Sequence, residues 1–99
     1  MKKRAVVFSP EARDDLLALY DWIAERGGAR VAMSYIDRLE AYCLSFDFAS
    51  ERGSCRDDVC EGLRIVGFER RITIAFTVGE HDVTILRLFS GGQNWEAFL

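Results

Sequence analysis

Apolar side chains recur at intervals of three and four residues through the first half of the chain, which predicts two amphipathic helices. The first helix starts after Ser9, whose hydroxyl can cap it, with Pro10 in the first turn, where no amide is needed. Its apolar stripe consists of Ala12, Leu16, Leu19, Tyr20 and Ile23. A second stripe follows Gly27-Gly28 and consists of Ala32, Tyr35, Ile36, Leu39, Tyr42, Cys43 and Phe46. Because the link is so short, two helices of about eighteen residues must pack antiparallel as an αα-hairpin.

The second half of the chain shows the period of two that is typical of β-strands. Residues 63–66 predict one strand, and residues 72–78 alternate between apolar and mostly polar side chains, as in a half-buried strand. Residues 83–89 are apolar on both faces except for Thr84 and Arg87, so we expect this strand to be central and covered. Short turns separate the three strands, which predicts an antiparallel meander.

These elements predict an α+β fold. Residues 4–8 carry a short strand signal, so the order is a short N-terminal strand, the αα-hairpin and then the three-stranded antiparallel meander, forming one sheet packed on two helices. Ninety-nine residues predict a single domain spanning 1–99. Residues 47–61 lack periodicity and are expected to form a solvated connector, with a partner-binding loop as the alternative. Residues 93–99 are expected to add a last half-turn.

The charge balance favours protein partners over nucleic acid. Thirteen Lys and Arg residues against sixteen Asp and Glu residues give a net charge of −3. Small proteins that bind nucleic acid usually carry a basic surplus, because neutralising phosphates supplies most of the affinity. We therefore expect no direct sequence-specific nucleic-acid binding. No apolar run approaches the roughly 18–20 residues that span a bilayer, and the N-terminus lacks a signal-peptide core, so we expect a cytoplasmic protein without membrane contact.

Few residues suit catalysis or metal binding. The one histidine, His81, falls at a predicted hairpin tip, where a general acid or base is not expected. The three cysteines, Cys43, Cys55 and Cys60, are an odd number and are expected to be free thiols. Because a zinc site needs about four ligands, these residues would be hard to assemble into one. The chain also lacks a glycine-rich phosphate loop, and we predict no metal, no cofactor and no conventional hydrolase site.

Arg87 is the candidate that most needs an explanation. A guanidinium within an apolar strand is costly unless it is paired or faces a ligand. Strand alternation predicts that Arg87 shares a face with Val83, Ile85 and Phe89. Either it pairs with an acidic residue of the fold, such as Glu61 or an aspartate of the 47–61 loop, or it opens into a groove.

The order and spacing of several motifs resemble the ParE/RelE superfamily of type II toxin–antitoxin toxins. These motifs are the S-P-E-A opening with its D-L…I helix in FSPEARDDLLALYDWIAERGG, and the L-R-I and I-L-R-L strands in GLRIVGFERRITIAFTVGEHDVTILRLFSGG. The resemblance covers essentially the whole chain. Within this superfamily, RelE-like toxins cleave messenger RNA on the ribosome, with basic residues around the sheet and a tyrosine or histidine near the C-terminus. ParE-like toxins share the fold but poison DNA gyrase without that catalytic set.

The segment after the last strand decides between the two branches. It reads FSGGQNW and contains no histidine, tyrosine or lysine. Phosphodiester cleavage needs a proton acceptor, a proton donor and charge stabilisation, and arginines supply only the last. The resemblance therefore implies a noncatalytic inhibitor of DNA gyrase, neutralised by a ParD-like antitoxin in a hetero-oligomer. The alternatives are a RelE-like ribonuclease using Arg64, Arg71 and Arg87, and a degenerate toxin that only binds its antitoxin.

The candidate binding residues form two groups. The target-binding candidates, which the resemblance suggests, are Arg64, Arg71, Arg87 and Trp95. The antitoxin-binding candidates are Tyr20, Trp22 and Arg70; Trp22 lies at the flank of the first apolar stripe.

Overall fold

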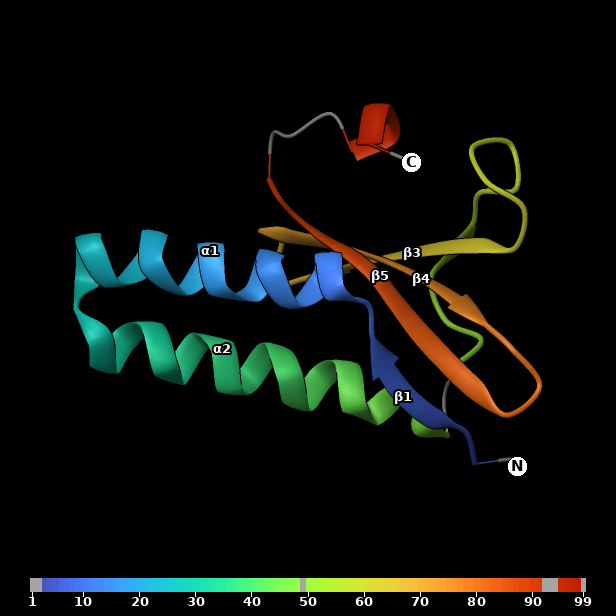
Figure 1. Ribbon diagram of the computed structural model, residues 1–99, viewed down its shortest axis with the longest axis horizontal. Coiled ribbons are helices and arrows are strands. Elements are labelled where there is room, and N and C mark those ends of the chain that lie inside the picture. The colour runs from blue at the N-terminus through green and yellow to red at the C-terminus, as the bar shows by residue number, and fades with distance from the viewer. Residues whose placement is uncertain (1–2, 49, 92–94, 99) are drawn as a thin grey trace.

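The computed structural model describes residues 3–48, 50–91 and 95–98, and it confirms the predicted α+β fold. Two antiparallel helices lie side by side and extend past one end of a twisted sheet (Figure 1). The elements are β1 (Ala5–Phe8), α1 (Pro10–Gly27), α2 (Ala29–Leu44), the 3-10 helix η1 (Ser45–Asp47), β2 (Ser54–Cys55), β3 (Leu63–Phe68), β4 (Ile72–Val78), β5 (Asp82–Ser90) and the 3-10 helix η2 (Trp95–Phe98).

The sheet has the strand order β1-β5-β4-β3-β2. Strand β1 pairs in parallel with β5, and all other neighbours are antiparallel. The last strand of the meander therefore lies between two others, as its apolar character predicted. The two-residue strand β2 was not predicted, because two residues are too few to show a period. It pairs Ser54 with Ile65 and Cys55 with Arg64, so part of the 47–61 segment belongs to the sheet.

A single residue joins the two helices. Gly28 has φ +90°, and its amide donates to Ala24 at 2.9 Å, which closes the last turn of α1. The carbonyl of the same residue accepts from Ala32 at 3.1 Å, which opens the first turn of α2. Only glycine adopts such a positive φ without strain. The predicted αα-hairpin is therefore present with the shortest of links.

Two clusters of buried side chains lie on opposite faces of the sheet. The larger one joins the helices to one face, and its largest buried members include Leu39 of α2, Phe46 of η1 and Phe76 of β4. The smaller one comprises Leu63, Ala75 and Phe89, which are at most 1% exposed. Because Ala75 lies between two residues of the larger cluster along β4, the smaller cluster faces away from the helices.

A β-bulge in β5 changes the face on which its later residues lie. Phe76 of β4 pairs with Ile85, but the preceding Ala75 pairs with Arg87, which leaves Leu86 without a partner. Arg87 therefore lies on the sheet face of Ala75, opposite the helix-side cluster to which Ile85 belongs. The prediction that Arg87 shares a face with Val83 and Ile85 is wrong for this reason.

Ser9 connects the end of β1, the start of α1 and the bulge. As predicted, it is the N-cap of α1: its Oγ accepts from the amide of Ala12 at 3.0 Å. The same hydroxyl donates to the carbonyl of Leu86, the bulged residue, at 2.7 Å. The Ser9 amide donates to Ile85 at 2.9 Å. One hydroxyl thus fixes the direction in which the helix leaves the sheet.

We predict that Ser9→Ala lowers the free energy of unfolding by about 1–2 kcal/mol, because it removes the helix cap and one partner of the Leu86 carbonyl. Chemical denaturation of the purified protein measures this change. Ser90→Ala is the control, because Ser90 is exposed at the end of β5 and should change stability little. Equal stability of the two variants would contradict this role of Ser9.

Candidate functional site

Arg87 is held in an ion pair with Asp15 of α1. Its Nε and Nη2 donate to the two carboxylate oxygens at 2.8 and 3.0 Å, and the side chains are only 24% and 17% exposed. Hydrogen bonding to Asp15 raises the pKa of Arg87, which therefore stays charged. An ion pair within the fold was one of the two alternatives for Arg87. The expected partner was wrong, since it is neither Glu61 nor an aspartate of the 47–61 loop.

Asp15 also accepts a hydrogen bond from the backbone of β5. Its Oδ2 accepts from the amide of Leu88 at 2.9 Å, beyond the point where β1 ends opposite Ile85. The carboxylate therefore takes the place of a neighbouring strand on this part of the edge. Sequence reasoning missed Asp15; the signal available was its position beside Leu16, at the border of the apolar stripe.

Arg64 lies on the other face of the sheet. It pairs with Phe76, whose side chain belongs to the helix-side cluster, whereas Arg87 pairs with Ala75 of the opposite cluster. Residues opposite each other in antiparallel strands share a face, so the sheet separates Arg64 from Arg87. The structure does not bring together the arginine set that a RelE-like ribonuclease would use.

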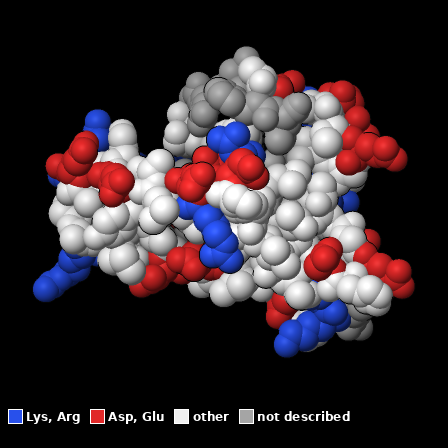
Figure 2. All heavy atoms as spheres, in the orientation of Figure 1, with Lys and Arg blue, Asp and Glu red and all other residues white. Residues whose placement is uncertain are grey.

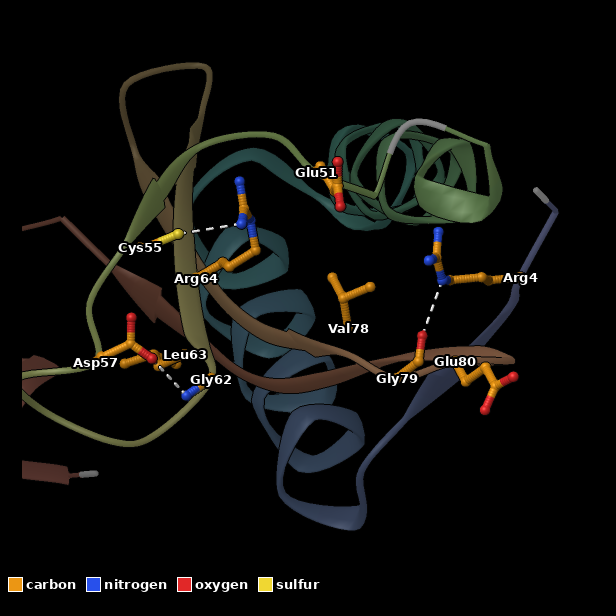
Figure 3. A pocket seen from close by; sticks show the side chains of 10 residues that line it. All are labelled: Arg4, Glu51, Cys55, Asp57, Gly62, Leu63, Arg64, Val78, Gly79 and Glu80. Carbon is orange, nitrogen blue, oxygen red and sulfur yellow. Dashed lines mark hydrogen bonds between the residues drawn. The ribbon is translucent and has the colours of Figure 1, made fainter. Parts of the chain in front are cut away.

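A pocket of about 470 Å³ surrounds Arg64 (Figure 3). We call it the arginine pocket. It lies where β3, the turn between β4 and β5, and the N-terminal segment meet, and its charged and thiol side chains are Arg4, Glu51, Cys55, Asp57, Arg64 and Glu80. Neither Arg71 nor Arg87 lines it. Arg4 and Cys55 are pocket residues that sequence reasoning did not single out, because the fold brings them to Arg64 from distant segments.

Neutral groups hold both arginines of this pocket in place. Arg4 donates from Nε to the carbonyl of Gly79 at 2.8 Å and from Nη1 to Ser50 Oγ at 2.9 Å. Arg64 donates from Nε to the carbonyl of Arg52 and from Nη1 to Cys55 Sγ, both at 3.1 Å. Within the described residues, neither guanidinium forms an ion pair with a carboxylate.

The turn between β3 and β4 presents Arg70 and Arg71 to solvent. Glu69 and Arg70 both have positive φ, 49° and 59°, which costs energy for residues with a side chain. Arg38 of α2 steadies the turn through two hydrogen bonds to Glu69, at 3.1 and 3.3 Å. Beneath it, the Tyr35 hydroxyl is buried with no hydrogen-bond partner in the described residues, and burial raises its pKa. The candidates Arg70 and Arg71 are thus exposed on a strained turn.

The helices carry apolar residues outside the predicted core stripes. Trp22 is 52% exposed, and the guanidinium of Arg26 lies 4.0 Å from its ring. Tyr20, the other candidate on this helix, is half-buried. Sequence reasoning overlooked four more exposed apolar side chains on the helices, which are Leu17, Val31, Met33 and Leu44. They lie off the core stripes, so only their exposure in the structure distinguishes them from core residues.

An ion pair connects the C-terminal helix η2 to the loop before β3. Arg56 donates to Glu96 at 3.2 Å and makes two hydrogen bonds of 2.9 Å to Asp58. Hydrogen bonding to Asp58 raises the pKa of Arg56. The expected half-turn near the C-terminus is therefore present in the backbone. The side chain of the candidate Trp95 lies outside the described residues.

Charges of both signs are interspersed over the face of the molecule seen in Figure 1 (Figure 2). This face offers no extended basic surface of the kind that binds a phosphate backbone. Within the described residues, no helix is both long enough and apolar enough to cross a bilayer.

Comparisons with known proteins identify what this chain is similar to. Its residues 6–95 match the family described as "ParE toxin of type II toxin-antitoxin system, parDE". Among solved structures, a chain of the "Chromosomal ParDE TA system from P. aeruginosa" is similar, with a TM-score of 0.78 and 21% sequence identity. That alignment covers 89% of this chain and 96% of the other. No curated protein matches the sequence.

We predict that Arg87→Ala lowers the free energy of unfolding by about 1.5–3 kcal/mol, because it removes hydrogen bonds between charged groups. Denaturation of Arg87→Ala, Asp15→Ala and the double variant forms a thermodynamic cycle, in which we expect an interaction energy above about 1 kcal/mol. Arg38→Ala is the matched control: it breaks an Arg–Glu pair that is about half exposed and should cost much less. Additive effects of the two single changes would rule out the coupling.

We also predict that a thiol reagent at pH 8 modifies Cys55 and Cys60 in the folded protein but spares Cys43. The first two are exposed, whereas Cys43 is buried, and burial raises its pKa to about 12. Its thiol therefore stays protonated and unreactive. Mass spectrometry identifies the modified residues, and denaturant should make all three react. Modification of Cys43 in the folded state would show that the larger core opens readily.

Proposed function

This chain belongs to the ParE toxin family of type II toxin–antitoxin systems, and we propose that it is a noncatalytic inhibitor of DNA gyrase that a ParD-like antitoxin neutralises. The observation that carries the proposal is the separation of the arginines. Asp15 neutralises Arg87, and the sheet separates Arg87 from Arg64. Phosphodiester cleavage would need such cations to converge on one phosphate together with a proton donor and acceptor.

The position of the histidine supports the same conclusion. His81 is 80% exposed in the turn between β4 and β5, and its nearest carboxylate is that of the adjacent Glu80, at 3.9 Å. A general base is normally held in a cleft by packing. His81 has no such setting, and it does not line the arginine pocket.

The helices offer the surface that we assign to the antitoxin. Leu17, Trp22, Met33 and Leu44 are each about half exposed or more, at 65%, 52%, 47% and 52%. An amphipathic helix of a partner binds exposed apolar side chains of this kind through its own apolar face. The similar solved chain is described as part of a ParDE toxin–antitoxin system, and by analogy we propose a hetero-oligomer with a ParD-like antitoxin here.

The target candidates Arg87 and Arg71 differ in their surroundings. Arg87 is hydrogen-bonded to Asp15 and is therefore better explained as a structural residue than as a target contact. Arg71 is exposed. The turn from which it extends is linked to α2 by the hydrogen bond between Arg38 and Glu69. We propose that Arg71, together with the C-terminal segment around Trp95, contacts gyrase.

We predict that the purified protein inhibits DNA supercoiling by gyrase and leaves ribosome-bound messenger RNA intact. Arg71→Ala should weaken the inhibition about tenfold without changing the melting temperature, because an exposed side chain contributes to binding rather than to the core. Leu17→Glu should retain inhibition but lose rescue by the antitoxin, because it puts a charge into an apolar interface.

Arg30→Ala is the matched control, since Arg30 is an exposed arginine on α2 that belongs to neither surface. Cleavage of messenger RNA with normal supercoiling would favour the RelE-like alternative. Antitoxin binding without either activity would identify a degenerate toxin.

A further inference from the structure

The arginine pocket has features of a binding site that the proposed gyrase inhibition does not use. It lies at the end of the sheet away from the link between α1 and α2, around the turn between β4 and β5 (Figures 1 and 3). Its volume of about 470 Å³ falls in the range of pockets that hold small ligands or a few residues of a peptide. None of the four apolar helix residues assigned to the antitoxin lines it.

The two arginines of the pocket have unused hydrogen-bonding capacity. Each uses Nε and Nη1 for neutral acceptors, and neither makes a hydrogen bond through Nη2 to a described residue. Figure 3 shows the two side chains on opposite sides of the space above Val78. A guanidinium fixed by two bonds and lacking a carboxylate partner is preorganised to accept an anion.

The carboxylates around the same pocket limit what that anion can be. Glu51, Asp57 and Glu80 line it together with Arg4 and Arg64, so two positive and three negative side chains give a net charge of −1. A polyanion such as nucleic acid would bring further negative charges close to these carboxylates. A ligand with a single carboxylate and basic groups beside it would pair the carboxylate with the arginines and the basic groups with the pocket carboxylates.

We propose that the arginine pocket binds an extended peptide segment of a protein partner that presents one carboxylate side chain between basic side chains. The carboxylate lies between Arg4 and Arg64 and accepts hydrogen bonds from their Nη2 groups. The flanking basic side chains contact Glu51 and Asp57. This assignment does not depend on gyrase being the target, and it uses none of the apolar helix residues assigned to the antitoxin.

The experiment follows the side-chain Nε–Hε signals of the arginines by NMR while the full chain is titrated with short peptides. The probes are N-acetyl-Lys-Asp-Lys-amide, the same peptide with Asn in place of Asp, and inorganic phosphate. We expect the Asp peptide to shift the Arg4 and Arg64 signals saturably, with a Kd at least about tenfold below that of the Asn peptide. Equal shifts by the two peptides would overturn the proposal.

Three variants sharpen this test. Arg64→Gln should raise the Kd for the Asp peptide about tenfold, whereas Arg30→Gln, at an exposed arginine on α2, should leave it unchanged. Glu51→Gln alters an exposed side chain and so leaves the core intact. It should weaken binding of the Asp peptide and strengthen binding of phosphate. Phosphate binding as tight as that of the Asp peptide in the unmodified protein would instead indicate a site for nucleic-acid or other phosphate groups and overturn the peptide assignment.

Discussion

Strand β1 ends before its neighbour β5 does. The rest of the structure depends on which groups form hydrogen bonds with the backbone of β5 beyond that point. Buried backbone groups need partners, and β1 supplies none beyond Ile85. The Ser9 hydroxyl and the Asp15 carboxylate supply them instead, to the carbonyl of Leu86 and the amide of Leu88. Because both side chains belong to the start of α1, the same contacts fix the helix on the sheet. The direction of α1 then sets that of α2, which is joined to it by one residue.

Arginines that look alike in the sequence have different physical roles in the structure. Arg87 is neutralised by Asp15 and joins a helix to a strand. Arg64 is held by a carbonyl and a thiol, so its charge is free to act on a ligand. Arg71 is exposed at a turn. One fold can carry different activities through such differences, which is why the site has to be argued residue by residue.

The parts of the fold that follow from local pattern could be predicted from the sequence. The helix stripes, the start at Ser9 and Pro10, and the alternation along β4 depend on neighbours a few residues apart. The bulge at Leu86 could not be predicted, because a bulge is defined by the pairing of two strands and both flanking segments are apolar. The pairing of Asp15 with Arg87 spans 72 residues, and Arg4 reaches Ser50 and Gly79 across 46 and 75. Such contacts are products of the tertiary structure.

The single-residue link at Gly28 also limits how this chain can change over evolution. Gly28 closes the last turn of α1 and opens the first turn of α2, so the link has no other residue that could absorb an insertion or a deletion. A change in its length would shift the start of α2, and with it the buried stripe from Ala32 to Cys43, relative to α1. Substitutions on the outer surfaces of both helices leave this geometry untouched. The exposed residues that meet a partner can therefore change without disturbing the fold, whereas a change in the length of the link disturbs the packing of both helices.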